Sequence, residues 1–120
     1  MPKNCDVEKI LKNRFRAVKK IQKKYGGICV LKGAGSLICQ NNTNITINTT
    51  GNPGMASGGM GDVLSGIIGA LVAQKIPLYQ AAQAGVYFHG LAADNASKYH
   101  GERGLSASQL LNSIQQVVNI

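Results

Sequence analysis

Residues 50–62 read Thr50-Gly51-Asn52-Pro53-Gly54-Met55-Ala56-Ser57-Gly58-Gly59-Met60-Gly61-Asp62, a glycine-rich loop that leads directly into an apolar segment of helical length. Glycine lets a ligand approach the main chain closely. The first N–H groups of a helix have no partner inside it, and the helix dipole adds partial positive charge there. The main chain at Gly58, Gly59, Met60 and Gly61 is therefore predicted to form an anion hole suited to a phosphoryl group in transfer.

Asp62 stands at the start of the predicted helix, beside this anion hole. A carboxylate there can accept the proton of an attacking hydroxyl, as a general base does. An aspartate at a helix start is also a common N-cap, and a glycine run can simply make a tight turn. The loop is neither a Walker A motif nor a dinucleotide-binding G-x-G-x-x-G motif. From the residues alone, a catalytic role and a capping role of Asp62 both stay open.

The helix predicted over residues 62–74 is apolar on nearly every face, which is typical of a helix buried in the body of a protein. Its large apolar residues are Val63, Leu64, Ile67, Ile68, Leu71 and Val72, and Gly66, Gly69 and Ala70 lie between them. These small residues permit a close approach of another backbone. Pro77 suits the first turn of the next helix, which is alanine-rich and is predicted to run to about Tyr99.

Upstream of the loop, residues 6–24 predict an amphipathic helix with its apolar stripe turned inward and its Lys and Arg residues in water. The stripe consists of Leu11, Phe15, Val18 and Ile21. Gly26 and Gly27 predict the end of this helix, with glycine in the left-handed conformation. The apolar run 28–31 predicts a strand covered on both faces, and residues 37–39 and 45–47 predict a β-hairpin. A helix, a glycine turn and a buried strand in this order indicate an α/β fold.

Lys32, Gly33, Ala34, Gly35 and Ser36 follow the predicted strand directly. Lys32 is well placed to bind phosphate, and a solvated lysine is the alternative interpretation. Near the C-terminus, Ser106 and Gln109 form a capping-box pattern for a last helix whose apolar positions are Leu110, Ile114, Val117 and Val118. His89, on the alanine-rich helix, is interpreted as a packing residue, and His100 as part of a surface loop.

Length and composition favour a single domain over residues 1–120, because 44% of the residues are hydrophobic and only 15% are charged. The formal net charge is +8, but residues 1–24 hold nine of the thirteen Lys and Arg residues. This excess indicates a solvated helix face rather than a nucleic-acid interface, since no aromatic residues outside the apolar stripe accompany it. No apolar run approaches the length of a membrane span. The three cysteines lack metal-ligand spacing and are typical of reduced thiols in the cytoplasm.

The segment Asn52 to Gly66 resembles the signature of the ADP-dependent NAD(P)H-hydrate dehydratases, a family within the ribokinase-like superfamily. The G-x-G-D core is shared across that superfamily, and the preamble N-P-G-M-A points to the dehydratases. Two further segments agree with this resemblance: 30–36 is similar to the family's nucleotide loop V-L-K-G-[AS]-x-[ST], and 84–94 to its helix A-G-x-x-x-H-G-x-A-A-D. The terminal residues 110–120 also match the family's ending, so the resemblance covers essentially the whole chain.

The resemblance implies that Lys32, Gly33, Ala34, Gly35 and Ser36 line the phosphates of ADP or ATP, and that Gly61 contributes an amide to the nucleotide. Asn52 and Asp62 would contact the substrate, hydrated NADH or NADPH, and Asp62 would activate its ring hydroxyl. ADP would phosphorylate this hydroxyl, and elimination of phosphate would restore NAD(P)H and leave AMP. Magnesium would accompany the phosphates as substrate counter-ion, without a metal-binding cluster in the protein.

The chain is shorter than the family's dehydratase domain, so the resemblance implies a C-terminal portion that lacks the N-terminal half of a ribokinase-like fold. The strand at 28–31 would then expose an edge, which predicts a homo-oligomer or a complex with a separate N-terminal chain. Weak or absent turnover by this chain alone is expected. Two alternatives stay open: a ribokinase-like kinase acting on a small alcohol, and a remnant that binds nucleotide or a partner without catalysis.

Overall fold

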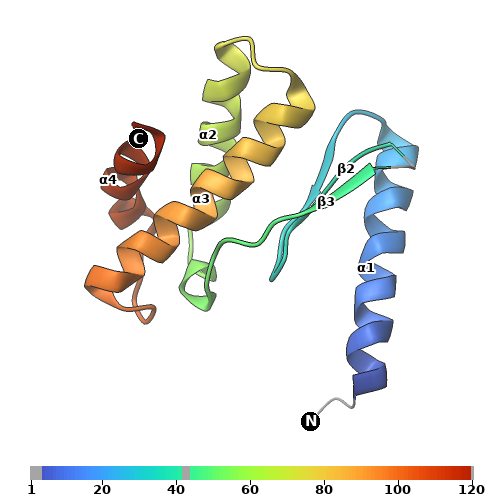
Figure 1. The fold of residues 1–120 in the computed structure, drawn as a ribbon, viewed down its shortest axis with the longest axis horizontal. Helices are drawn as coiled ribbons and strands as arrows, with labels where there is room; N and C mark the ends of the chain where they lie inside the picture. Colours follow the sequence, from blue (N-terminus) through green and yellow to red (C-terminus); the bar gives the residue numbers. More distant parts are fainter. Residues whose placement is uncertain (1–3, 42–43, 120) are drawn as a thin grey trace. The chain divides into compact units, whose positions relative to one another are not determined.

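The computed structural model describes residues 4–41 and 44–119, with side chains at 12–41 and 45–119 (Figure 1). The chain separates into two compact units, Met1–Ile47 and Asn48–Ile120, and each is described by itself. The prediction of one domain over residues 1–120 stays a prediction. None of the described helices has the length and apolar character needed to cross a membrane.

Unit 1 consists of helix α1 (Asn4–Tyr25) and a three-stranded sheet of β1 (Cys29–Leu31), β2 (Leu37–Asn41) and β3 (Asn44–Ile47). The strands follow one another as an antiparallel meander in the order β1-β2-β3. Helix α1 packs on the face of the sheet that carries Leu37 and Cys39, with Val18 fully buried between them. The predicted helix, glycine stop and hairpin are confirmed; Gly26 has a φ of 73° just after the last helical residue.

The prediction that the strand at 28–31 is covered on both faces is wrong for this chain. β1 is an edge strand of the meander, and its three residues are only half-buried. The reason lies in the connection: only five residues separate β1 from β2, whereas a crossover to a parallel strand needs a dozen or more. The chain therefore turns back at Lys32–Ser36 and pairs Leu31 with Leu37.

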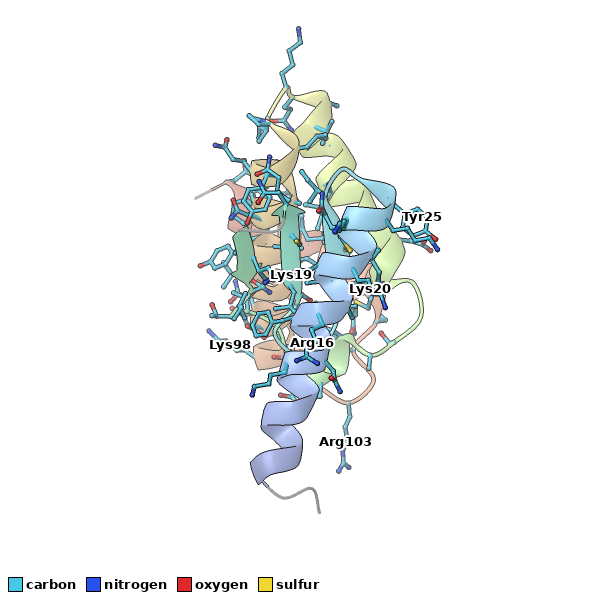
Figure 2. The ribbon with its side chains drawn as sticks, turned by 90° about the vertical axis from the view of Figure 1, so that its right-hand side faces the viewer. Arg16, Lys19, Lys20, Tyr25, Lys98 and Arg103 are labelled. Atoms are coloured by element: carbon cyan, nitrogen blue, oxygen red, sulfur yellow. The ribbon has the colours of Figure 1, made fainter. Side chains whose placement is uncertain are left out.

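The basic face of α1 is exposed, as predicted, and Figure 2 shows Arg16, Lys19 and Lys20 projecting from this helix. Lys24 places its Nζ 5.3 Å from the centre of the Tyr25 ring, a cation–π contact at the helix end. The apolar stripe is buried only in its middle: Val18 is inaccessible, whereas Ile21 is 42% exposed. Leu11, the fourth member of the stripe, lies outside the described side chains.

Unit 2 is helical and contains a short 3-10 helix η1 (Pro53–Met55) followed by α2 (Met60–Ala73), α3 (Leu78–His100) and α4 (Ala107–Val118). Helix α3 lies between the other two and packs against both (Figure 1). Its alanines Ala92, Ala93 and Ala96 form a core with Met60, Leu105, Leu110 and Val117. The predicted helices from Pro77 and from Ser106 are confirmed, and the Ser106 amide donates to Gln109 Oε1 at 2.9 Å.

The helix predicted over 62–74 begins two residues earlier, at Met60, and the prediction that it is buried is wrong for this chain. Only Met60 and Leu64 are buried, and the other large apolar side chains of α2 are half-buried. The reason is that α2 packs within unit 2 mainly along one side, against α3. There Gly85 approaches so closely that an added Cβ would lie 2.6 Å from Ile68 Cγ1. On the other side, added Cβ atoms at Gly66 and Gly69 would meet nothing within 4 Å.

Candidate functional site

The N-terminus of α2 presents a row of backbone donors. Gly59 is the N-cap residue and has a φ of 84°, a left-handed conformation that favours glycine. The first amide bonded within the helix is that of Val63, which donates to Gly59 O at 3.1 Å. In the described part of the chain, no acceptor is bonded to the amides of residues 58–62. The donors that the sequence assigned to an anion hole are therefore available at this helix end.

Asp62 lies in the first turn of α2, three residues after the N-cap, and its side chain is exposed. No hydrogen bond or ion pair to another described residue holds its carboxylate. A capping bond from this side chain is thus absent among the described residues, which leaves the carboxylate available to a ligand. Met60 is buried and Gly61 is half-buried, so the main chain beside Asp62 is fixed by the core while the carboxylate faces outward.

The segment that leads into the loop is tied to α3. Thr50 Oγ1 donates to Tyr87 O at 3.0 Å, and the Gly51 amide donates to Asp94 Oδ2 at 3.0 Å. Gly90 permits this approach, because an added Cβ there would lie 2.7 Å from the Thr50 carbonyl carbon. The three contacts use one face of α3, since positions 87, 90 and 94 are three and four residues apart.

Asn52 has both of its side-chain groups engaged inside unit 2. Its Nδ2 donates to Asp94 Oδ1 at 2.9 Å, and its Oδ1 accepts from the Gly54 amide at 2.9 Å, which caps η1. Asp94 therefore accepts two bonds from adjacent residues of the loop, through one oxygen each. These bonds give Asn52 a part in shaping the loop, and its contact with substrate stays a prediction.

The far end of the loop is fixed by the connection between α3 and α4. Ser57 Oγ donates to Leu105 O at 3.0 Å, and an added Cβ at Gly54 would lie 2.6 Å from Glu102 O. An added Cβ at Gly59 would lie 3.2 Å from Ala107 Cβ. The loop is thus held at both ends, which fixes the main chain that leads to the open amides at the start of α2.

In unit 1, Lys32–Ser36 form the tight turn between β1 and β2. The Gly33 amide and the Ser36 hydroxyl face each other at 3.3 Å, and the hydroxyl lies 3.2 Å from Gly33 O, so Ser36 closes the turn. Lys32 is exposed. Arg14 of α1 reaches the same turn, and its Nη1 donates to Ala34 O at 2.7 Å. Of the residues that the sequence assigned to the nucleotide, those at 32–36 are adjacent within unit 1, whereas Gly61 lies in unit 2, next to the residues assigned to the anion hole and the base.

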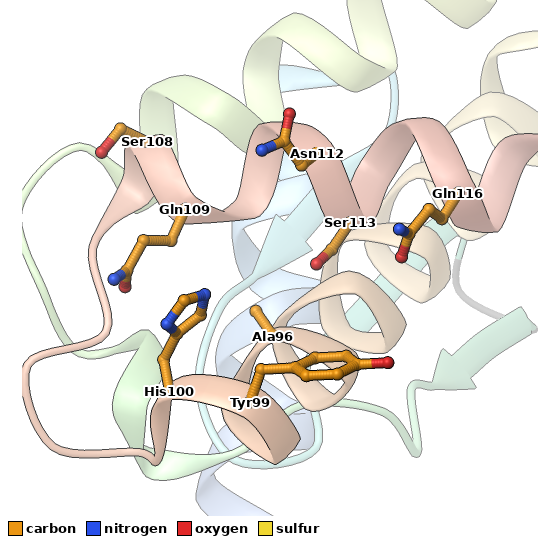
Figure 3. A pocket seen from close by; sticks show the side chains of 8 residues that line it. All are labelled: Ala96, Tyr99, His100, Ser108, Gln109, Asn112, Ser113 and Gln116. Carbon is orange, nitrogen blue, oxygen red and sulfur yellow. The ribbon is translucent and has the colours of Figure 1, made fainter.

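A pocket of about 370 Å³ lies between α3 and α4, and none of the predicted catalytic or nucleotide-binding residues lines it (Figure 3). It is lined by Ala96, Tyr99, His100, Ser108, Gln109, Asn112, Ser113 and Gln116. His100 is exposed here, at the last residue of α3 rather than in the surface loop that the sequence predicted. His89 is buried within α3, which agrees with a packing role. Among the described residues, no group of three or more His, Cys, Asp or Glu side chains could hold a metal ion.

The chain matches a family model described as NAD(P)H-hydrate dehydratase over residues 3–116. It belongs to the NAD(P)H-hydrate dehydratase family. A bifunctional NAD(P)H-hydrate repair enzyme from Vibrio cholerae is 54% identical over 115 residues, which are 96% of this chain and 23% of that protein. The chain therefore spans about a quarter of the length of this relative.

Solved structures show the same fold. The ADP/ATP-dependent NAD(P)H-hydrate dehydratase of Bacillus subtilis, crystallised with ATP and Mg²⁺, is 28% identical, with a TM-score of 0.84 over 94% of this chain and 41% of that one. A ribokinase-like superfamily protein from Enterococcus faecalis is 32% identical, with a TM-score of 0.73 over 84% of this chain and 34% of that one. The resemblance to the dehydratases and the partial ribokinase-like α/β fold are thereby confirmed.

The sequence of this dehydratase-family chain did not predict the contacts of two residues, Arg14 and Asp94. Arg14 was assigned to the solvated basic face of α1, and that is wrong: its side chain is half-buried against the turn at 33–36. Its helical spacing was the available signal, since Arg14 lies three residues after Leu11 and four before Val18 of the apolar stripe, whereas the exposed Arg16 does not. Asp94 ends the segment 84–94 that carried part of the resemblance, but no role was drawn for it. A carboxylate on an otherwise alanine-rich helix could have predicted bonds to nearby donors, because a half-buried acid needs hydrogen-bond donors.

Proposed function

We propose that this chain provides the nucleotide turn, the anion hole and the catalytic base for the ADP-dependent dehydration of hydrated NADH or NADPH. The observation that carries the proposal is the set of open amides at residues 58–62 beside the exposed Asp62, in a chain of this family. Fixed donors aimed at a position where negative charge develops stabilise a transition state more than a ground state.

The proposed reaction follows from these groups. Asp62 takes the proton of the hydroxyl on the hydrated nicotinamide ring, and the oxygen attacks the β-phosphorus of ADP. The amides around Gly61 donate to the phosphoryl oxygens, while Lys32 and the turn that follows it bind the nucleotide phosphates. AMP leaves, and loss of phosphate from the ring together with a proton from the neighbouring ring carbon restores the double bond of NAD(P)H. A general base of this kind contributes about 10²–10⁴-fold to the rate.

Magnesium fits this site only as the partner of the phosphates. The described residues offer no cluster of carboxylates to hold it, and Mg²⁺ commonly binds one or two protein oxygens together with substrate phosphates. When bound with the nucleotide it would neutralise phosphate charge. Either ADP or ATP fits these groups, since none of them distinguishes the two nucleotides. The cytoplasmic location stays a prediction of the cysteine pattern.

The experiment is calorimetric titration of the chain with ADP, repeated on two variants. Gly61→Val places a branched side chain beside the amide donors, and it should abolish ADP binding. Asp62→Asn keeps the size of the side chain and removes the base, so binding should remain within about threefold. In the same samples, recovery of NADH absorbance from hydrated NADH would report the dehydratase, and a stable phosphorylated product would report the kinase alternative.

We further propose that the reaction needs a partner chain, either a second copy or a separate polypeptide. Within unit 1, the described residues pair with only one edge of β1, and an open strand edge invites pairing with another chain. Light scattering at micromolar concentration tests this, and a monodisperse monomer with full dehydratase activity would contradict it.

A further inference from the structure

Arg14 places a positive charge beneath the turn that is proposed to bind the nucleotide. Its Nη1 donates to Ala34 O at 2.7 Å, which bonds the guanidinium to the main chain in the middle of the turn. Its Nη2 is buried and has no hydrogen-bond partner among the residues that the structure describes. A buried donor without a partner is costly, and more so when it carries charge.

No acid stands one helical turn before or after Arg14 in α1. Acids three or four residues away could pair with it, but those positions hold Ile10, Leu11, Ala17 and Val18. No ion pair to a described carboxylate is formed either. Two cations therefore lie at the turn: Lys32, which is exposed, and Arg14, which is half-buried.

The turn is shaped to receive this guanidinium. Gly33 has a φ of 153°, and an added Cβ there would lie 3.1 Å from Arg14 Nη2 and 3.6 Å from its Cζ. A side chain at position 33 would therefore crowd the guanidinium and strain the backbone. Ser36 closes the turn through its bonds to the main chain of Gly33, and Ala34 O accepts the bond from Arg14.

We propose that Arg14 is a positioning residue for the nucleotide phosphates: it fixes the turn at 33–36 through Ala34 and supplies positive charge next to it. This inference rests on the proposed function, because the anion is the nucleotide of that reaction. The planar array of donors of a guanidinium suits a bond to the main chain with further donors to spare.

Three variants of the chain test this role. Arg14→Met keeps much of the apolar stem and removes the donor and the charge, whereas Arg14→Lys keeps the charge and one donor. Arg16→Met removes an exposed arginine from the same helix and is the matched control. Hydrogen exchange of the segment 32–36 in the ligand-free chain reports the turn. Calorimetry with ADP and with adenosine reports the phosphate contribution, and thermal melting reports the fold.

In Arg14→Met, exchange of the turn should rise at least tenfold, and ADP should bind about tenfold more weakly while adenosine changes less than twofold. Arg14→Lys should restore ADP affinity to within about threefold, and Arg16→Met should behave like the wild type. Equal effects of Arg14→Met and Arg16→Met, or an equal loss for ADP and adenosine, would overturn the proposal. Should Arg14→Met not fold, an ADP affinity in Arg14→Lys more than tenfold below wild type would overturn it. Wild type that binds no ADP would refute the proposed function and with it the role of Arg14 toward phosphates, whereas unchanged ADP binding by Arg14→Met would overturn the role of Arg14 alone.

Discussion

Asp94→Asn should destabilise unit 2, because the carboxylate is the shared acceptor for two donors of the loop. In the native chain, Oδ2 accepts from the Gly51 amide at 3.0 Å and Oδ1 accepts from Asn52 Nδ2 at 2.9 Å. The asparagine can keep one of these bonds, but its amide group turns a donor toward the other donor. Hydrogen bonds to a charged group contribute about 1.5–3 kcal/mol each.

Asp94 is half-buried, so water offsets part of the lost interaction. We therefore expect Asp94→Asn to lower the free energy of unfolding by about 1–2 kcal/mol, and Asp94→Ala by about 2–4 kcal/mol. The matched control is Glu102→Gln, which removes one negative charge from an exposed position of the same unit. Surface changes of that kind usually stay within about 0.5 kcal/mol.

Urea unfolding followed by circular dichroism measures these differences, with the slope of the transition checked for constancy. A second readout is the hydrogen exchange of residues 50–56, which should rise in Asp94→Asn and stay unchanged in Glu102→Gln. If Asp94→Asn and Glu102→Gln cost the same and leave the loop equally protected, Asp94 does not anchor the loop and the argument for a fixed anion hole fails.

Gly90→Ala should lower the free energy of unfolding in urea by at least about 2 kcal/mol, because its Cβ would meet the Thr50 main chain. Gly66→Ala, whose Cβ would meet nothing within 4 Å, should raise this free energy by about 0.5–1 kcal/mol through helix propensity. Similar values for the two variants would contradict the packing described. Burial first, and the facing Cys39 second, raise the pKa of the Cys29 thiol above its ordinary value. Cys29 should therefore be alkylated more slowly in the native chain than in urea at pH 8, as peptide mass spectrometry can show. The contribution of Cys29 to the free energy of unfolding should be full below the pKa of the unfolded state and be lost as the pH rises through the pKa of the folded state. Equal alkylation rates in both states would contradict the burial of that thiol.

Sequence patterns predicted the helices of this chain well, because their signals are local. The capping box at Ser106, the proline before Leu78 and the glycines after Tyr25 all mark helix ends within a residue or two. The amides of residues 58–62 before and in the first turn of α2 have no bonded acceptor among the described residues, and the anion hole itself stays a prediction. Each of these features depends on residues that are close neighbours in the chain.

The errors concern burial and side-chain partners, which depend on residues far apart in the sequence. The strand at 28–31 and the helix α2 are apolar enough to be covered on all sides, yet both are half-buried in this chain. Arg14 lies beside the apolar stripe on α1, but its bond to Ala34, 20 residues downstream, is not visible in that local spacing. Asp94 likewise finds its partners 42 and 43 residues upstream, a separation that no local pattern reports.

The attachment of the loop to α3 has a consequence for the heat-capacity change of ligand binding. A segment whose main chain is already ordered gives a ligand nothing to fold, so the entropic penalty of ordering that lowers the affinity of disordered binding loops is avoided. Nucleotide association with this chain should accordingly show only a small negative heat-capacity change, far from the large values that accompany coupled folding.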